Sequence, residues 1–247
     1  MTMKQSYRGR LLAAFCTVTF LALVGAGVGC SKDDVVGDAT AEAVEAGLNG
    51  VLNDTVKPLA TFLGEIPTIV SGGTFRHSFG GGATCPDTSG VCGGGGAVVC
   101  TPSGGGTTLT FDFDECVVVT GDDPLTLDGV VIATPGDPIL LTFQSLFINN
   151  HPAISGTGSV SVSGCSYIVN VTTTDDAGVS GTIIQCDADP YPTVASHLTV
   201  QVGNFQIDIN FDGSATAHSV ATNGGNTVAT CDINLAADPL TSSCSAP

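Results

Sequence analysis

The sequence predicts a mainly β protein: an antiparallel meander of about ten strands, preceded by a short N-terminal helical segment. From Thr107 onward apolar and polar residues alternate, as in Leu109-Thr-Phe-Asp-Phe113 and Phe205-Gln-Ile-Asp-Ile209. A period of two is typical of strands with one buried and one wet face. Turn dipeptides such as Gly203-Asn204, Asp212-Gly213 and Asn223-Gly224 separate these segments. Many short strands joined by tight turns favour a sandwich, a barrel or an extended sheet.

Five segments are expected along the chain. Residues 1–29 are predicted to be a signal peptide, residues 30–38 a lipidated tether and residues 39–66 a helical segment. A Gly- and Cys-rich loop region follows at 67–106, and the antiparallel β domain occupies 107–247. Its strands are expected at 109–114, 125–133, 139–148, 154–162, 165–172, 179–186, 194–202, 205–211 and 229–235.

The helical segment rests on apolar residues spaced three or four apart, a pattern typical of an amphipathic helix. Val44, Leu48 and Val51 begin the pattern, and it continues to Leu63. Asp54-Thr55 and Pro58 are expected to divide it into two helices. Pro58 is expected inside the first turn of the second helix, where proline is tolerated best. The apolar stripe predicts packing against the β domain.

The N-terminus has the order of regions that an export signal needs. A basic start contains Lys4, Arg8 and Arg10, an apolar run follows from residue 11, and the run ends in Gly27-Val28-Gly29-Cys30. A cysteine directly after small residues resembles the lipobox of bacterial lipoproteins. The resemblance covers residues 1–30 only, and an ordinary signal peptide or an uncleaved N-terminal anchor are the alternatives.

The lipoprotein resemblance implies a lipid on Cys30: a diacylglycerol on its thiol and a further acyl chain, such as palmitate, on its amine. More than one chain gives stable anchoring, so the expected partner is a membrane, reached through the N-terminal lipid. Ser31 follows the cysteine. By analogy with enterobacterial lipoproteins, this implies the bacterial outer membrane, with the protein facing the periplasm or the cell surface.

The charge of the chain excludes nucleic acid as a partner. Lys32, Lys57 and Arg76 are the basic residues after position 29, against 23 acidic ones, so the predicted mature chain carries a net charge of −20. From His77 to Pro247 there are 16 acidic residues and no Lys or Arg. Nucleic acids and anionic lipid surfaces bind through basic residues, so neither suits this region.

Eight of the ten cysteines follow Cys30, and an even number in an exported chain indicates disulfides. A metal cluster is the alternative, but no CxxC or His-rich spacing occurs. Pairing of sequential neighbours is expected. These pairs are Cys85 with Cys92, Cys100 with Cys116, Cys165 with Cys186, and Cys231 with Cys244.

The sequence contains one candidate metal motif, for calcium. Asp208-Ile-Asn210-Phe-Asp212-Gly213 matches the first half of a calcium loop, D-x-[DN]-x-[DN]-G. Asp208, Asn210 and Asp212 are therefore candidate calcium ligands. The match ends there, because the twelfth position is Ser219 and the flanking segments are predicted strands. Otherwise no cofactor is expected.

No motif assigns an enzymatic reaction. A G-x-S-x-G elbow and an H-E-x-x-H sequence are both absent, and the four histidines are isolated along the chain. The sequence therefore favours a non-enzyme: a lipid-anchored β domain with a structural or interaction role. A module that binds a small apolar molecule or a carbohydrate is the alternative, and a hydrolase is a third. An aromatic-lined cavity would favour the module, and a histidine and a carboxylate that converge with a serine in a cleft would favour the hydrolase. A solid β core with a polar exterior would leave the first hypothesis.

Overall fold

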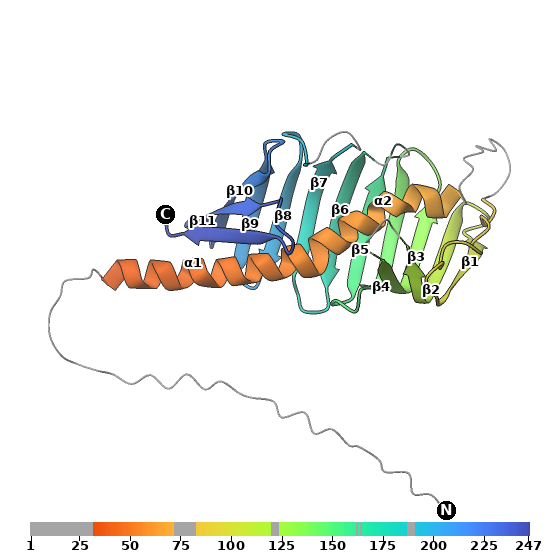
Figure 1. The fold of residues 1–247 in the computed structure, drawn as a ribbon, viewed down its shortest axis with the longest axis horizontal. Coiled ribbons are helices and arrows are strands. Elements are labelled where there is room, and N and C mark those ends of the chain that lie inside the picture. Colours follow the sequence, from red (N-terminus) through yellow and green to blue (C-terminus); the bar gives the residue numbers. More distant parts are fainter. Residues whose placement is uncertain (1–31, 72–82, 120–123, 162, 164, 187–190) are drawn as a thin grey trace, which may run out of the picture. The chain divides into compact units, whose positions relative to one another are not determined.

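The computed structural model describes residues 32–71, 83–119, 124–161, 163, 165–186 and 191–247, and Figure 1 shows their arrangement. The predicted signal peptide and Cys30 lie outside the described residues. Lys32–Pro247 forms one compact unit. None of its described helices is both long enough and apolar enough to cross a membrane.

Twelve strands form a single antiparallel sheet in which every strand pairs with its neighbours in the sequence. The strands are β1 (Ala97–Ser103), β2 (Thr108–Val118), β3 (Leu125–Thr134), β4 (Ile139–Ile148), β5 (Ile154–Val160), β6 (Ser166–Thr173), β7 (Gly178–Ile184), β8 (His197–Val202), β9 (Phe205–Phe211), β10 (Thr216–Asn223), β11 (Asn226–Asn234) and β12 (Thr241–Ser245).

The predicted antiparallel meander is confirmed, and its form is an extended open sheet with β1 and β12 at the edges. These two edge strands were not predicted, and neither was β10. β1 lies inside the expected loop region, and its burial pattern lacks a regular buried face. β12 consists of Thr, Ser and Cys. Neither strand has the apolar alternation that identifies a strand with one buried face.

The N-terminal helical segment is a continuous rod made of α1 (Lys32–Val51), a π-helical segment η1 (Leu52–Val56) and α2 (Lys57–Ser71). It begins at Lys32 and ends at Ser71, so it is longer at both ends than the predicted helix at 39–66. The division expected at Asp54-Thr55 and Pro58 is the π-helical segment, which contains Asp54 and Thr55, and Pro58 lies in the first turn of α2 as predicted. Proline cannot donate to the carbonyl group four residues earlier, and the wider π turn accommodates the missing bond without ending the helix.

The rod crosses the sheet on one face (Figure 1). α1 contacts β8, β11 and β12, and α2 contacts β3, β4 and β5. At 1.5 Å per residue, its 20, 5 and 15 residues span about 60 Å. Twelve strands about 4.8 Å apart span about 53 Å, so the rod is long enough to cover the sheet from edge to edge.

The core lies between the rod and this inner face of the sheet. Phe62 of α2 is fully buried and meets Phe113 of β2 edge-on, with ring centroids 6.2 Å apart. Phe111 and Phe143 are buried on the same side, at 1% exposure each. The buried side chains of the rod and of the sheet form one continuous hydrophobic cluster. The predicted packing of the apolar helical stripe against the β domain is therefore confirmed.

The turns follow the predicted dipeptides only in part. Gly203-Asn204 forms a two-residue connection, because Val202 pairs with Phe205. In the next case the pairing of Asn223 with Asn226 makes Gly224-Gly225 the turn, rather than Asn223-Gly224. Both glycines have positive φ, as a type I′ turn requires. Asp212-Gly213 lies in a longer loop, since Phe211 pairs with Ala217.

Gly181 of β7 permits a close approach between β7 and β8. Its φ is +143°, and a Cβ atom there would lie 2.9 Å from the Leu198 Cα and closer still to the His197 carbonyl oxygen. We expect Gly181→Ala to lower the free energy of unfolding by about 2–3 kcal/mol, since both backbone strain and overlap oppose it. Gly203→Ala is the control for positive φ alone, because a Cβ atom at Gly203 would meet no other atom within 4 Å. Equal losses in urea unfolding of the two variants would contradict the overlap argument.

Candidate functional site

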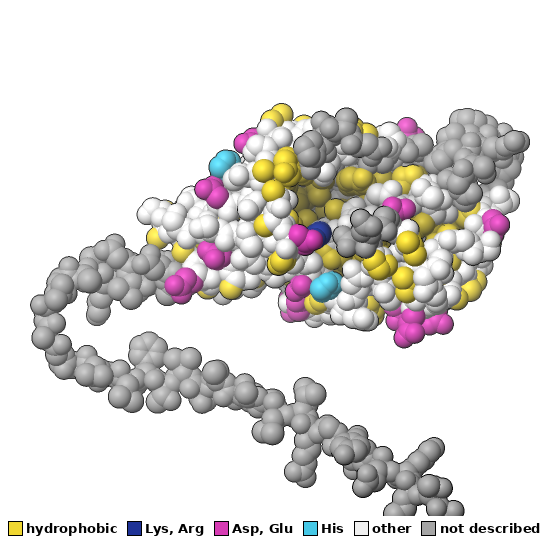
Figure 2. Space-filling model, in the orientation of Figure 1, with side chains coloured by type: hydrophobic (Ala, Val, Ile, Leu, Met, Phe, Trp, Pro, Cys, Tyr) yellow, Lys and Arg dark blue, Asp and Glu magenta, His cyan; other side chains and the backbone are white. Residues whose placement is uncertain are grey.

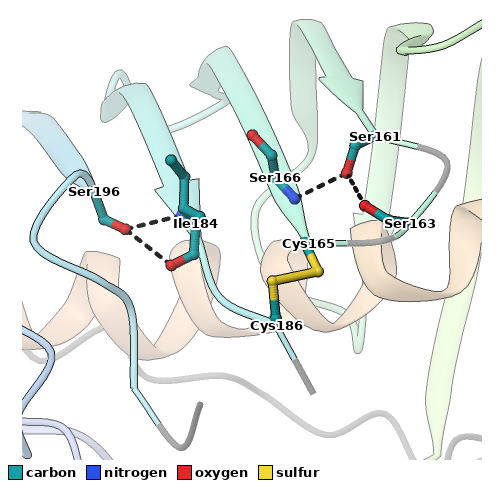
Figure 3. The surroundings of a disulfide bond; sticks show 7 residues. All are labelled: Ser161, Ser163, Cys165, Ser166, Ile184, Cys186 and Ser196. Atoms are coloured by element: carbon teal, nitrogen blue, oxygen red, sulfur yellow. Dashed lines mark hydrogen bonds between the residues drawn. A yellow bond between two sulfur atoms is a disulfide. The ribbon is translucent and has the colours of Figure 1, made fainter. Parts of the chain in front are cut away.

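Four disulfides join all eight cysteines that follow Cys30. Two predicted pairs are confirmed. Cys231 and Cys244 face each other across β11 and β12. Cys165 and Cys186 flank the hairpin of β6 and β7 (Figure 3), where the Gln185 amide also donates to the Cys165 carbonyl at 2.9 Å.

The other two predicted pairs are wrong: Cys85 bonds to Cys100, and Cys92 bonds to Cys116. The register of β1 against β2 explains the difference. Cys100 pairs with Phe111, five residues away from Cys116 along β2. The chain before β1 instead runs beside the end of β2, where the Gly94 amide donates to the Val117 carbonyl at 3.1 Å and brings Cys92 next to Cys116.

The rod also covers the free edge of β12. Three α1 and η1 acceptors at four-residue intervals take alternate amides of the last segment: Glu45 Oε2 from Cys244 at 2.9 Å, Asn49 Oδ1 from Ser242 at 2.7 Å, and Asn53 Oδ1 from Leu240 at 2.8 Å. The Asn53 side-chain amide returns a bond to the Leu240 carbonyl at 2.9 Å. Alternate residues of an edge strand point their backbone groups outward, so this helix face substitutes for a thirteenth strand.

The outer face of the sheet, opposite the rod, is polar. One row across neighbouring strands runs from Thr110 to Val220 and is polar except at Ile132 and Val220. Its members are Thr110, Ile132, Thr142, Thr157, Asn170, Ser180, Thr199, Asp208 and Val220. Large apolar side chains on this face are separate from one another, as at Leu140 and Ile168. The outer sheet face is therefore an exposed and mainly polar surface.

Asp208, Asn210 and Asp212, the predicted calcium ligands, lie along β9 and the residue after it. The segment is extended, so the three side chains follow one another along the outer face, whereas a calcium loop curls around the ion. Asp208 accepts hydrogen bonds from Thr199 at 2.8 Å and from Gln206 at 3.1 Å. Calcium binding stays a prediction.

Asp212 begins a local turn in which its Oδ1 accepts the Ser214 amide hydrogen at 2.8 Å. Hydrogen bonds from the Ser214 side chain and backbone hold the pKa of the Asp212 carboxyl below its usual value, and the charge of His218 contributes in the same direction. Asp212 therefore has a structural role at this turn and lies within electrostatic reach of His218.

Two of the histidines pair with carboxylates. His218 Nδ1 lies 2.7 Å from Asp232 Oδ1 on the outer sheet face. His151 Nδ1 lies 3.3 Å from Asp54 Oδ1 at the π-helical segment. Sequence reasoning missed both pairs, because the partners are 14 and 97 residues apart and only the strand register or the rod position brings them together. In the described part of the chain, no hydrogen bond joins a serine hydroxyl to a histidine.

Two pockets flank the rod. A pocket of about 240 Å³ lies beside the π-helical segment, lined by small residues such as Gly47 and Gly50 and by the carboxylates Asp54 and Asp175. Beneath α2, an apolar pocket of about 10 Å³ is lined by residues that include Leu63 and Ile183. Figure 2 shows hydrophobic side chains around a hollow on this side of the molecule, and acidic side chains scattered over the rest of the view. Both volumes are below the 300–1,000 Å³ usual for drug-sized ligands.

Comparisons with known proteins identify no relative: no family model, no curated protein and no solved structure matches the chain.

Proposed function

We propose that the protein is a lipid-anchored extracytoplasmic β domain with a structural or interaction role. The four disulfides support an oxidising compartment, because such bonds are rare where thiols are kept reduced. The lipobox resemblance at Cys30 supports the anchor. In this proposal the membrane is the bacterial outer membrane, and the disulfide-bonded β domain lies at its surface.

The filled core is the observation that favours an interaction role over ligand binding. The rod covers the inner face of the sheet, and its inward side chains are almost fully buried, with Leu48, Phe62 and Leu63 at 0% exposure. A ligand would have to displace this rod to reach the inner sheet face. The polar outer face then carries the contacts of the protein with its surroundings.

Replacement of Cys30 tests the anchor. We expect Cys30→Ser to move the protein from the membrane fraction to the soluble fraction and to abolish incorporation of labelled palmitate, because the lipid would have no thiol to join. Cell fractionation with carbonate extraction, together with fatty-acid labelling, measures both effects.

Cys16→Ser is the matched control, since Cys16 lies within the predicted signal peptide and should leave both readouts unchanged. A Cys30→Ser protein that still resists carbonate extraction would show an uncleaved N-terminal anchor. Release of both variants and of the unaltered protein would show an ordinary signal peptide. Either result would overturn the lipid anchor.

A further inference from the structure

Four polar side chains form a row across the outer face near the β12 edge. His197 of β8 pairs in register with Asn210 of β9, Asn210 with His218 of β10, and His218 with Asp232 of β11. Residues paired across antiparallel strands point to the same side of a sheet. All four are exposed, so the row stands open to solvent.

Asp232 orients the His218 ring. Its Oδ1 lies 2.7 Å from Nδ1, and the two side chains are 71% and 63% exposed. With Nδ1 as donor to this carboxylate, the lone pair of the neutral ring is on Nε2. The two ring nitrogens point in nearly opposite directions, so Nε2 faces away from β11. A carboxylate behind an imidazole in this way is the usual support of a metal-binding histidine.

His197 lies on the side of His218 opposite Asp232, with Asn210 between the two histidines. Residues two strands apart are about 10 Å apart at their Cα atoms. Two imidazole rings that lean toward each other over this gap can reach one ion, given bonds of about 2.0–2.1 Å from nitrogen to zinc.

We propose that His197 and His218 bind a divalent transition-metal ion of the zinc, copper or nickel class, with Asp232 as the positioning residue. Imidazole nitrogen suits these ions, whereas calcium takes oxygen ligands. Solvent completes the coordination of an ion held by two side chains at an exposed site.

The surrounding charge favours a cation. Asp232 borders His218 on β11, Asp208 lies on the neighbouring row of β9, and Asp212 follows at the end of that strand. No Lys or Arg occurs between His77 and Pro247 to oppose the ion. The proposal therefore goes beyond a scaffold role and is independent of the lipid anchor.

Isothermal titration of the tag-free full-length chain with Zn²⁺, and Cu²⁺ electron paramagnetic resonance, test the site. We expect one ion per chain with two nitrogen ligands. His197→Gln or His218→Gln should each weaken binding at least about 10-fold, and Asp232→Asn by about 10–100-fold, as for other carboxylates behind a ligating histidine. The Cu²⁺ spectrum of Asp232→Asn should keep two nitrogens, which separates positioning from ligation.

His151→Gln is the matched control, because His151 also contacts a carboxylate, Asp54, yet lies away from the row. It should bind Zn²⁺ like the unaltered chain. Absence of binding, or equal affinity of the His197 and His218 variants with the unaltered protein, would overturn the proposal. Binding of Ca²⁺ in preference to Zn²⁺, lost in Asp208→Asn, would also overturn it and would support the oxygen site of the calcium motif instead.

Discussion

Reduction of the four disulfides should strongly destabilise the β domain and lower its melting temperature. Each closed loop contributes about 2–4 kcal/mol in the chain-entropy account, so the combined loss is of the order of the whole stability of a typical domain. The four bridges span 13 to 24 residues and together hold both edges of the sheet. Thermal unfolding with and without reductant, followed by circular dichroism, measures the effect.

Paired substitutions separate the bridges and provide the control. Cys92→Ser with Cys116→Ser removes one bond and leaves no free thiol, because the two cysteines are partners. Cys85→Ser with Cys92→Ser removes one cysteine from each of two bridges and leaves Cys100 and Cys116 unpaired. We expect the second combination to be the less stable and to expose thiols that react with iodoacetamide. The reverse order would support pairing of sequential neighbours in solution.

The alternation of residues was sufficient to predict the central strands except β10, whose buried residues Ala217, Ser219 and Ala221 are small. Leu109, Phe111 and Phe113 face the rod and are 1–2% exposed, so the period of two correctly predicted which face of this strand is buried. The same reasoning could not find β1, whose residues lack a regular buried side, or β12, whose backbone is held by the rod. The choice between an extended sheet and a barrel could not be predicted either, because it depends on the N-terminal rod that covers the inner face of the sheet.

The candidate site could be predicted only as separate residues. Asp208, Asn210 and Asp212 were predicted to bind calcium because they are close in sequence. In a strand, however, this spacing places them in a line. His197, His218 and Asp232 lie in one row across the sheet because three hairpins set the register of β8 to β11. A register is fixed by turn lengths, and the shift of one turn from Asn223-Gly224 to Gly224-Gly225 shows how easily a prediction of it fails.

The rod has a second role besides filling the core, because it closes the β12 edge. An uncovered edge strand presents unpaired amides and carbonyls that another chain can bind. The free edge of β1 is protected from pairing in a different way. Thr88 Oγ1 lies 3.5 Å from the Val98 carbonyl, and Pro102, two register positions beyond Cys100, has no amide hydrogen. The two edges of the sheet are therefore blocked by different means.

The combined variant Asn49→Ala with Asn53→Ala should lower the free energy of unfolding by about 2–5 kcal/mol. It leaves the Ser242 and Leu240 amides and the Leu240 carbonyl without their partners, and each unsatisfied group costs about 1–3 kcal/mol when it is shielded from water. The higher helix propensity of alanine offsets part of this loss. Urea unfolding measures the change, and sedimentation velocity should show self-association through the uncovered edge.

Glu42→Ala is the control, because Glu42 is an exposed acidic residue of the same helix. A loss below about 0.5 kcal/mol for the double variant, equal to that of the control, would contradict the role of the rod as an edge cap.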